Sequence, residues 1–326
     1  MTCPLAPDAL GPTISVGEIL VEIMATSPGC GFRAPLDLTG PYPSGAPAIF
    51  IDQCARIGGR AAMIGTVGND DFGRLNTERL ARDGADISAI AVDPVHPTGS
   101  AFVRYRADGS RDFVFNIATS AAARLGWSDP VAALVARAGH LHVMGSALVM
   151  PGAAAIIETA AQAVKARGGS VSVDPNLRKE LAHDALTARR FAGLVDLADL
   201  LLPSGEELER TAGVTGQAAA IEALFARGLR EIALKQGRAG ATVFAPGRAP
   251  LHAPAFAVTE IDPTGAGDCF GGAYVACRRL GLPLAQALTY ATAAGARTVT
   301  RRGPMEGAGT RAELDAFIAA TPRALP

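Results

Sequence analysis

The sequence lacks the features that mark membrane proteins and nucleic-acid-binding proteins. No apolar run of roughly 18 residues or more is free of charges, glycine and proline, so we expect no membrane-spanning helix. The formal net charge is −1, which leaves no overall basic field to attract nucleic acid or an acidic membrane surface. These absences leave a small molecule as the expected partner.

Disulfide and zinc frameworks are also missing. The five cysteines are an odd number without any C-x-x-C spacing, and the N-terminus has no charged region followed by a continuous apolar stretch. We therefore expect a reduced, cytoplasmic protein. His140 and His142 alternate within an apolar run that offers no further ligand, so we interpret them as strand residues and not as zinc ligands.

Two common nucleotide-binding signatures are absent as well. No Gly-Lys pair is followed by serine or threonine, which excludes a P-loop kinase. No G-x-G-x-x-G follows the first expected strand, which excludes a dinucleotide-binding dehydrogenase.

The sequence does contain the alternating strand and helix patterns that are typical of an α/β protein. The 326 residues are 49% apolar and 19% charged, enough for a large packed core. Short β-rich runs are followed by longer Ala/Leu-rich stretches with helical spacing, which predicts a mostly parallel sheet covered by helices on both faces. The expected strands include residues 61–65, 170–174, 198–202 and 231–235, and the expected helices include 72–83, 153–167, 206–212 and 218–226.

Two stretches break this alternation and predict a small separate β-structure. Residues 101–106 and 111–117 alternate in polarity around the turn signal Asp108-Gly109, which indicates a β-hairpin outside the main sheet. Residues 29–47 are rich in glycine and proline and are expected to form short strands and loops beside that hairpin. Together the two stretches predict a lid.

The most informative segment is residues 260–275. Residues 256–261 are interpreted as the end of a strand, Pro263 and the glycines as a turn, and the apolar spacing that follows as a helix beginning near Ala266. The backbone N–H groups of Gly265, Ala266 and Gly267 would then be unpaired at a helix N-terminus, where they form a site for phosphate oxygens.

Asp268 falls in the first turn of this expected helix, so its carboxylate projects toward the same place as those amides. A proton acceptor beside an anion cradle is what phosphoryl transfer to a hydroxyl requires. The alternative is that the turn merely begins a packed helix, with Asp268 as a favourable first-turn charge.

Five motifs in order along the chain resemble those of the ribokinase-like, or PfkB, carbohydrate kinases. The C-terminal signature resembles the segment that holds the catalytic base and anion hole. Two others resemble the segments near the nucleotide phosphates and the adenine, one resembles a motif common in ketodeoxygluconate kinase-like and fructokinase-like members, and one a family-wide string. The motifs are Ile64–Gly73, Asp174-Pro-Asn-Leu-Arg178, Leu234–Ala241, Asp262-Pro-Thr-Gly-Ala-Gly-Asp268 and Ala291–Gly303.

The resemblance implies one three-layer α/β/α domain over residues 1–326, with a lid built from inserted segments at about 20–45 and 98–118. It implies ATP and Mg²⁺ as cofactors, with K⁺ an open question, and a homodimer formed through the lid. It assigns Asp268 as the catalytic base and Gly265, Ala266 and Gly267 as the anion hole.

The same resemblance supplies candidates for each ligand. For the nucleotide they are Lys235, Gly237, Gly240, Thr264 and Thr292. For the substrate they are Glu18, Gly45, Asn116, Arg178 and Asp268. For metals they are Glu207, which would hold Mg²⁺ through water, and Asp262, beside Thr264, for a monovalent cation.

Departures from the family pattern concern the substrate. Ser44 stands for the first glycine of the sugar motif and Ile49 for its asparagine, and Ser204 stands for the asparagine that precedes Glu207. The Tyr-x-Arg string by which related 2-keto-3-deoxygluconate kinases hold a carboxylate is replaced by residues 115–117, Phe-Asn-Ile.

A lost arginine–carboxylate contact disfavours an acidic substrate, so we expect a neutral ketohexose, tagatose or fructose. Three alternatives stay open: a 2-keto-3-deoxygluconate kinase using Arg104, Arg106 or Arg178, a nucleoside or phosphosugar kinase, and a catalytically silent sugar-binding regulator.

Overall fold

The computed structural model describes residues 3–27, 29, 31–106, 111–176 and 184–324. Its main sheet has nine strands, of which those from β11 to β5 pair in parallel, while the β11–β12 and β12–β13 pairs are antiparallel. In spatial order they are β13 (Leu251–Ala253), β12 (Ala241–Phe244), β11 (Glu231–Lys235), β10 (Leu200–Leu201), β9 (Ser170–Asp174), β8 (His140–Met144), β1 (Thr13–Val16), β4 (Ala61–Gly68) and β5 (Asp86–Asp93).

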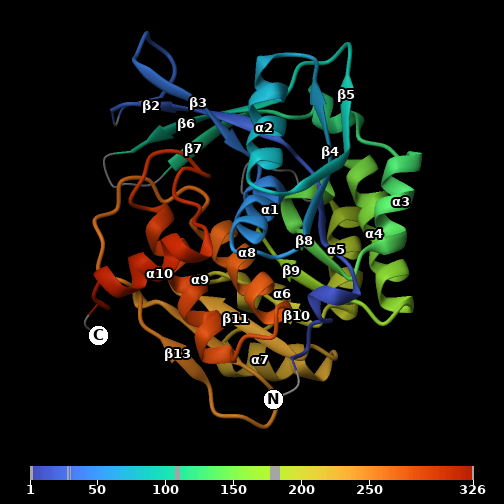
Figure 1. Cartoon of the computed structure of the whole chain (residues 1–326), viewed down its shortest axis with the longest axis vertical. Coiled ribbons are helices and arrows are strands. Elements are labelled where there is room, and N and C mark those ends of the chain that lie inside the picture. The colour runs from blue at the N-terminus through green and yellow to red at the C-terminus, as the bar shows by residue number, and fades with distance from the viewer. Residues whose placement is uncertain (1–2, 28, 30, 107–110, 177–183, 325–326) are drawn as a thin grey trace.

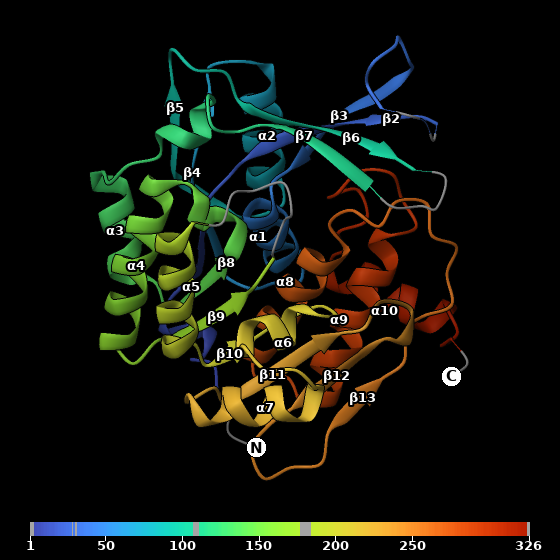
Figure 2. The ribbon, with the colours of Figure 1, turned by 180° about the vertical axis from the view of Figure 1, so that it is seen from behind.

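Helices cover both faces of this sheet, in three layers that the two opposite views show (Figures 1 and 2). One face carries α1 (Ala46–Arg56), α2 (Asp71–Arg82), α8 (Ala266–Arg279), α9 (Leu284–Thr298) and α10 (Arg311–Ala320). The other carries α3 (Asp129–Arg137), α4 (Pro151–Ala166), α5 (Ala185–Leu197), α6 (Glu207–Ala212) and α7 (Gln217–Ala226). The predicted α/β fold with a mostly parallel, doubly covered sheet is confirmed.

Two hydrophobic cores result, one on each face of the sheet. Along β4 the side chains alternate, so that Ala61 and Met63 enter one core while Ala62 and Ile64 enter the other. Because both faces of the sheet are buried, successive side chains of a central strand are all apolar, and the strand appears in the sequence as a continuous apolar run.

The expected strands at 170–174 and 231–235 coincide with β9 and β11, and the helix expected near Ala266 begins there. The strand expected to end over 256–261 is wrong. Within that stretch the structure pairs only Phe256, in a single bridge with Arg323. Phe256 and Val258 instead pack individually against the helical core, which gives the apolar run without a strand.

His140 and His142 lie on β8 and are fully buried, as their alternation predicted. The ring nitrogens of His140 bond Ser170 and Ser172, and the His142 ring stacks on Phe50 with centroids 3.6 Å apart. Burial lowers the pKa of both imidazoles well below the usual value. Both therefore act as neutral core residues.

A second sheet of four strands lies at one end of the molecule, in the order β3 (Leu38–Ser44), β2 (Leu20–Ala25), β6 (Gly99–Tyr105) and β7 (Arg111–Asn116). The antiparallel β6–β7 pair contains the two strands predicted as a hairpin, and its turn signal Asp108-Gly109 is outside the described residues. We call this second sheet the lid sheet.

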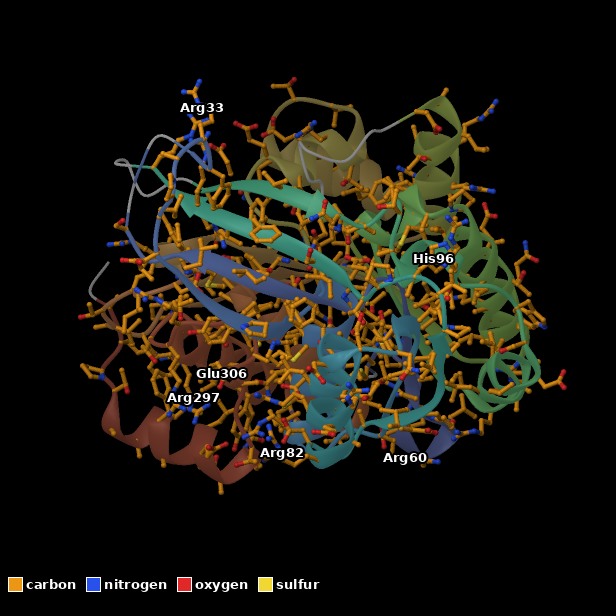
Figure 3. All side chains as sticks on the ribbon, turned by 90° about the horizontal axis from the view of Figure 1, so that it is seen from above. Arg33, Arg60, Arg82, His96, Arg297 and Glu306 are labelled. Atoms are coloured by element: carbon orange, nitrogen blue, oxygen red, sulfur yellow. The ribbon has the colours of Figure 1, made fainter. Side chains whose placement is uncertain are left out.

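Chain connectivity places the lid sheet beside the edge of the main sheet that is formed by the carboxyl ends of its parallel strands. β2 begins four residues after β1 ends, so the lid sheet starts at the carboxyl end of β1. Carboxyl ends of parallel strands share one edge, which is where ligands bind in such folds. In Figures 1 and 2 the lid sheet stands above this edge, with Arg33 exposed on the β2–β3 connection at its outer rim (Figure 3).

In the part of the chain that the structure describes, no helix combines the length and apolarity needed to cross a bilayer.

Candidate active site

The turn before α8 is shaped by Gly265. This residue caps the helix with φ +78°, and a Cβ built on it would lie 2.4 Å from the carbonyl oxygen of Pro304. Any other residue would meet both a left-handed backbone and a clash with main chain. The helix consequently opens with Ala266, whose N–H lies 3.5 Å from the carbonyl oxygen of Pro263. Gly265 and Gly267 line a pocket at this N-terminus, where the sequence predicted unpaired N–H groups.

Asp262 braces this turn from inside the protein. Its side chain is 1% exposed, and its carboxylate accepts hydrogen bonds from the N–H and hydroxyl of Thr264, the N–H of Gly303 and the hydroxyl of Tyr105. Three of these bonds end on Oδ1, and the bond from Gly303 ends on Oδ2. Asp262 therefore joins the turn, the loop after α9 and the lid sheet.

The loop after α9 is itself held by charged side chains. Arg297 donates to the carbonyl oxygens of Gly307 and Ala308, and Glu306 accepts from Arg79 at 3.2 Å. Arg297 and Glu306 lie near one another beside the C-terminal helices (Figure 3). This loop supplies the carbonyl of Pro304 that closes over Gly265.

Asp268 lies in the first turn of α8 and is 4% exposed. Its Oδ1 accepts a hydrogen bond of 3.2 Å from Nδ2 of Asn176. Asn176 adopts φ +41°, a left-handed conformation that asparagine tolerates better than most residues. The Asp-Pro-Asn motif after β9 thus orients the carboxylate at the mouth of the helix.

Three adjoining hollows meet around Asp268. The lid cavity lies under the lid sheet, the polar pocket lies beside the α8 N-terminus, and the apolar cleft runs between α8, α9 and residues 255–260. Asp268 lines both the lid cavity and the polar pocket. Lys235, Pro263 and Gly267 line both the polar pocket and the apolar cleft.

The apolar cleft contains most of the residues predicted to hold the nucleotide. Lys235, Gly237, Gly240 and Thr292 line it, together with Phe256 and Phe270. Thr264 does not line it: its hydroxyl donates to Asp262 and accepts from Arg111, and it faces the lid cavity. The structure therefore separates Thr264 from the other predicted nucleotide residues.

The polar pocket collects buried charges of both signs. Nζ of Lys235 pairs with Asp174, and Glu207 accepts a hydrogen bond of 2.8 Å from the N–H of Ser204. Burial by itself would lower the pKa of Lys235, but the carboxylates of Asp174, Glu207 and Asp268 outweigh it and raise that pKa. The lysine is therefore a permanent cation beside the α8 N-terminus.

The lid cavity is polar on one side and apolar on the other. Glu18 accepts from Ser146 at 2.9 Å, Glu22 accepts from Ser44 at 2.8 Å, and both carboxylates are buried. The apolar side consists of Leu20, Ile49, Phe113, Phe115 and Ile117.

Gly45, predicted to contact substrate, also lines this cavity. It has φ +109°, and a Cβ there would lie 2.3 Å from the carbonyl oxygen of Glu18. Backbone packing therefore requires the glycine, whatever its contact with a ligand.

The structure does not place two other predicted substrate residues, Asn116 and Arg178, in the lid cavity. Asn116 is exposed on the opposite face of β7, where it bonds Ser100, because side chains 113, 115 and 117 take the cavity face. This corrects the assignment of Asn116 to the site. Arg178 is outside the described residues.

Sequence reasoning missed four residues that surround Asp268: Glu22, Ser146, Asp174 and Arg111. Two had visible signals. Glu22 is a lone carboxylate within the apolar strand 20–25, and Asp174 precedes the proline of its own motif. Neither signal says which cavity the side chain enters.

Comparison with known proteins identifies the family that the sequence motifs resemble. Residues 39–311 match the model of the pfkB family carbohydrate kinase. The chain is 31% identical to fructokinase-1 of Zea mays, over 92% of this chain and 95% of that protein. It is 30% identical to a 2-dehydro-3-deoxygluconokinase of Thermoproteus tenax, over 96% of each.

Among solved structures, a candidate ribokinase II of E.coli in complex with ATP and Mg²⁺ superposes with a TM-score of 0.88. It is 43% identical, over 95% of this chain and 99% of that one.

Proposed function

The chain belongs to the pfkB family of carbohydrate kinases, and on this premise we propose that it transfers the terminal phosphoryl group of ATP to a hydroxyl of a neutral ketohexose. The observation that carries the proposal is the position of Asp268, between a cavity under the lid sheet and a pocket at a helix N-terminus. The order of the three hollows matches the order of the reactants: adenosine in the apolar cleft, phosphates in the polar pocket, sugar in the lid cavity.

In this mechanism a sugar hydroxyl lies within hydrogen-bond reach of Asp268. The carboxylate accepts its proton as the oxygen forms a bond to the γ-phosphorus, and the bond between that phosphorus and the β,γ-bridging oxygen breaks to release ADP. The amides of Gly265, Ala266 and Gly267 donate to the phosphoryl oxygens. One such preorganised donor is typically worth on the order of 3 kcal/mol in the transition state.

Lys235 contributes charge along the phosphate path. Its ammonium lies at the junction of the apolar cleft and the polar pocket and is kept protonated by Asp174. Gly237, Gly240 and Thr292 would then contact the nucleoside side of ATP. Thr264 is assigned to the turn rather than to the nucleotide.

The polar pocket suits Mg²⁺. This ion usually keeps several waters and takes only one or two protein carboxylates, which fits Glu207 at the pocket wall. When bound, Mg²⁺ would neutralise charge on the phosphate oxygens.

A monovalent cation fits Asp262 less well. Oδ1 already accepts three hydrogen bonds from the protein, so only Oδ2, which accepts one from Gly303, keeps an acceptor position for a cation. We assign no mechanistic step to such an ion.

The lid cavity favours an uncharged substrate. Glu18 and Glu22 offer acceptors to sugar hydroxyls, and no described arginine or lysine lines this cavity. Arg104 and Arg106, the alternative anchors for an acid, both pair with Asp112 within the lid sheet. A substrate carboxylate would therefore lie among carboxylates without the charge-assisted contact it needs.

The keto acid remains the second candidate, because the Thermoproteus tenax relative acts on that class and Arg178 lies outside the described residues. We also propose that the lid sheet closes over the sugar to exclude water, and that its outer face pairs two chains into a homodimer. Size-exclusion chromatography with light scattering tests the dimer.

The test of substrate class is a coupled ADP-release assay with D-tagatose, D-fructose, D-ribose and 2-keto-3-deoxygluconate. The expected result is the highest kcat/KM with one of the two ketohexoses. A clear preference for the keto acid would reverse the substrate assignment, and sugar binding without ADP release would indicate a silent regulator.

A further inference from the structure

Arg111, the first residue of β7, extends from the lid sheet to the turn before α8. Its Nη1 donates a hydrogen bond of 2.6 Å to the hydroxyl of Thr264, and its side chain lines the polar pocket with Gly265, Gly267 and Asp268. A residue of the lid sheet thus reaches the polar pocket, where we place the γ-phosphate of ATP.

Two other described arginines, at the end of the neighbouring strand β6, share one carboxylate of the lid sheet. Arg104 and Arg106 both bind Asp112, with N–O distances of 2.6 and 2.8 Å. Arg111 forms no salt bridge within the described part of the chain. Its described contacts are a neutral hydroxyl and the ring of Phe113, whose centroid lies 5.8 Å from the guanidinium carbon.

A guanidinium held by a hydroxyl keeps its full charge for a ligand. Its planar, multi-donor geometry also matches the oxygens of a phosphoryl group better than an ammonium does. By contrast, an arginine already paired with a carboxylate would have to lose that partner first.

We propose that Arg111 is a catalytic residue that the lid sheet supplies to the transferring phosphoryl group. This inference rests on the proposed kinase function and deepens it. Arg111 donates hydrogen bonds to nonbridging oxygens of the γ-phosphoryl group as the bond to the sugar oxygen forms and the bond to ADP breaks. The proton of the sugar hydroxyl still goes to Asp268.

Strand alternation explains how one strand serves two tasks. Residues 111, 113, 115 and 117 share a face, so Phe113, Phe115 and Ile117 cover the lid cavity while Arg111 extends over the polar pocket. This position also separates Arg111 from a carboxylate-binding role, since it lines the phosphate side of Asp268 and not the lid cavity.

A functional consequence follows for ATP alone. The cation reaches the phosphoryl site only when the lid sheet lies against the α8 turn, as it does here. If sugar binding favours this closed position, it also brings the positive charge of Arg111 to the γ-phosphate. Without sugar that charge is missing, so transfer of the phosphoryl group to water is slow.

The experiment compares Arg111→Ala, Arg111→Lys and the control Arg106→Met, which changes an arginine of the neighbouring strand end. Arg111→Ala is expected to lower kcat about 100-fold or more, as the loss of one preorganised donor to developing charge typically does, while the KM for sugar changes less than about fivefold. Arg111→Lys should recover part of kcat, and Arg106→Met should retain it.

Added guanidinium ion provides a readout that a structural role would not produce. It should raise kcat of Arg111→Ala at concentrations that leave the melting temperature unchanged, and sodium at equal ionic strength should not. A kcat within about threefold of the unsubstituted enzyme, or a loss expressed only in the KM for sugar, would overturn the proposal.

A second measurement separates this proposal from the proposed function. MgADP with fluoroaluminate mimics the transferring phosphoryl group and should raise the melting temperature of the unsubstituted protein beyond MgADP alone. Arg111→Ala should lose that increment, and an unchanged increment would reject the role of Arg111. If no sugar in the panel is phosphorylated, the substrate assignment fails and the fluoroaluminate result still decides on Arg111.

Discussion

The hydroxyl of Tyr105 donates a hydrogen bond of 3.1 Å to Oδ1 of Asp262 and so joins the end of β6 to the turn that precedes α8. Burial raises the pKa of this phenol, and the nearby Asp262 carboxylate raises it further, so the hydroxyl stays a donor at physiological pH. Beside it, Arg111 bonds Thr264 of the same turn. The position of the lid sheet in this structure therefore depends on contacts with the turn before α8, to which we assign the anion hole.

Tyr105→Phe removes the Tyr105 bond and should weaken closure. A hydrogen bond to a charged acceptor contributes about 1.5–3 kcal/mol, so we expect the KM for sugar to rise about tenfold or more with little change in the affinity for ATP alone. Steady-state kinetics and nucleotide titration measure the two quantities. Tyr42→Phe is the control, because its hydroxyl bonds Thr39 within the lid sheet; equal effects of both variants would contradict the prediction.

Asp268→Asn tests the catalytic base. Asparagine keeps the shape and can still accept from Asn176, but it cannot take the proton of a sugar hydroxyl. We expect kcat to fall about a hundredfold or more while MgATP binds as before. Near-normal turnover, measured by ADP release, would remove Asp268 from this role.

Two glycines of the same turn should respond differently to alanine. Gly265→Ala places a methyl group 2.4 Å from a backbone oxygen at a left-handed position, and is expected to cost about 1–3 kcal/mol of stability. Gly267→Ala meets nothing closer than 3.5 Å, so the fold should be retained, but its methyl group points toward Lys235 in the phosphate path.

Thermal unfolding and ATP kinetics separate the two outcomes. Gly265→Ala should lower the melting temperature, whereas Gly267→Ala should keep it and raise the KM for ATP or lower kcat. A larger loss of stability in Gly267→Ala than in Gly265→Ala would contradict this reading of the turn.

Glu22→Gln tests the polar side of the lid cavity. The substitution keeps a partner for Ser44 but removes the negative charge, which weakens hydrogen bonds from sugar hydroxyls. We expect the KM for a ketohexose to rise about tenfold, and the preference for ketohexose over the keto acid to narrow. An unchanged KM, with ATP kinetics as the internal control, would show that Glu22 does not face the substrate.

Asp52 provides a pH-dependent prediction about stability. Burial raises its pKa to about 8, with Arg79 opposing and Asp83 adding to the shift. In the unfolded chain the same carboxyl releases its proton near its ordinary pKa of about 3.9. Between these values the native protein binds more protons, so this group lowers stability as pH rises from about 4 to about 8.

Asp52→Asn removes that dependence. Its stability relative to the unsubstituted protein should therefore increase with pH across this window, by at most about 1.4 kcal/mol per pH unit. Denaturant unfolding at pH 5.5 and 8.0 measures it, with Asp71→Asn as a control because the Asp71 side chain is 92% exposed. A difference that does not change with pH would show that Asp52 is ionised throughout.

Local chemistry accounts for the predictions that succeeded. A glycine at positive φ, the helix start at Ala266 and a first-turn aspartate are neighbours in the chain, so their arrangement at the start of α8 follows from adjacent residues. The same holds for β9 and β11, whose apolar runs match their bounds. Asn116, the strand at 256–261 and the place of Thr264 depended instead on contacts between distant segments.

The sequence by itself determined the fold class and the chemical groups at the α8 N-terminus, because both follow from periodicity and from residues next to one another. Tertiary structure decided which groups meet across the cavity. The lid sheet packs against a turn some 150 residues further along the chain, and this packing brings Arg111 and Tyr105 to the α8 turn. The same packing decides which face of β7 each side chain occupies. No local pattern encodes that packing, since strand register fixes faces only once the partner surfaces are in place.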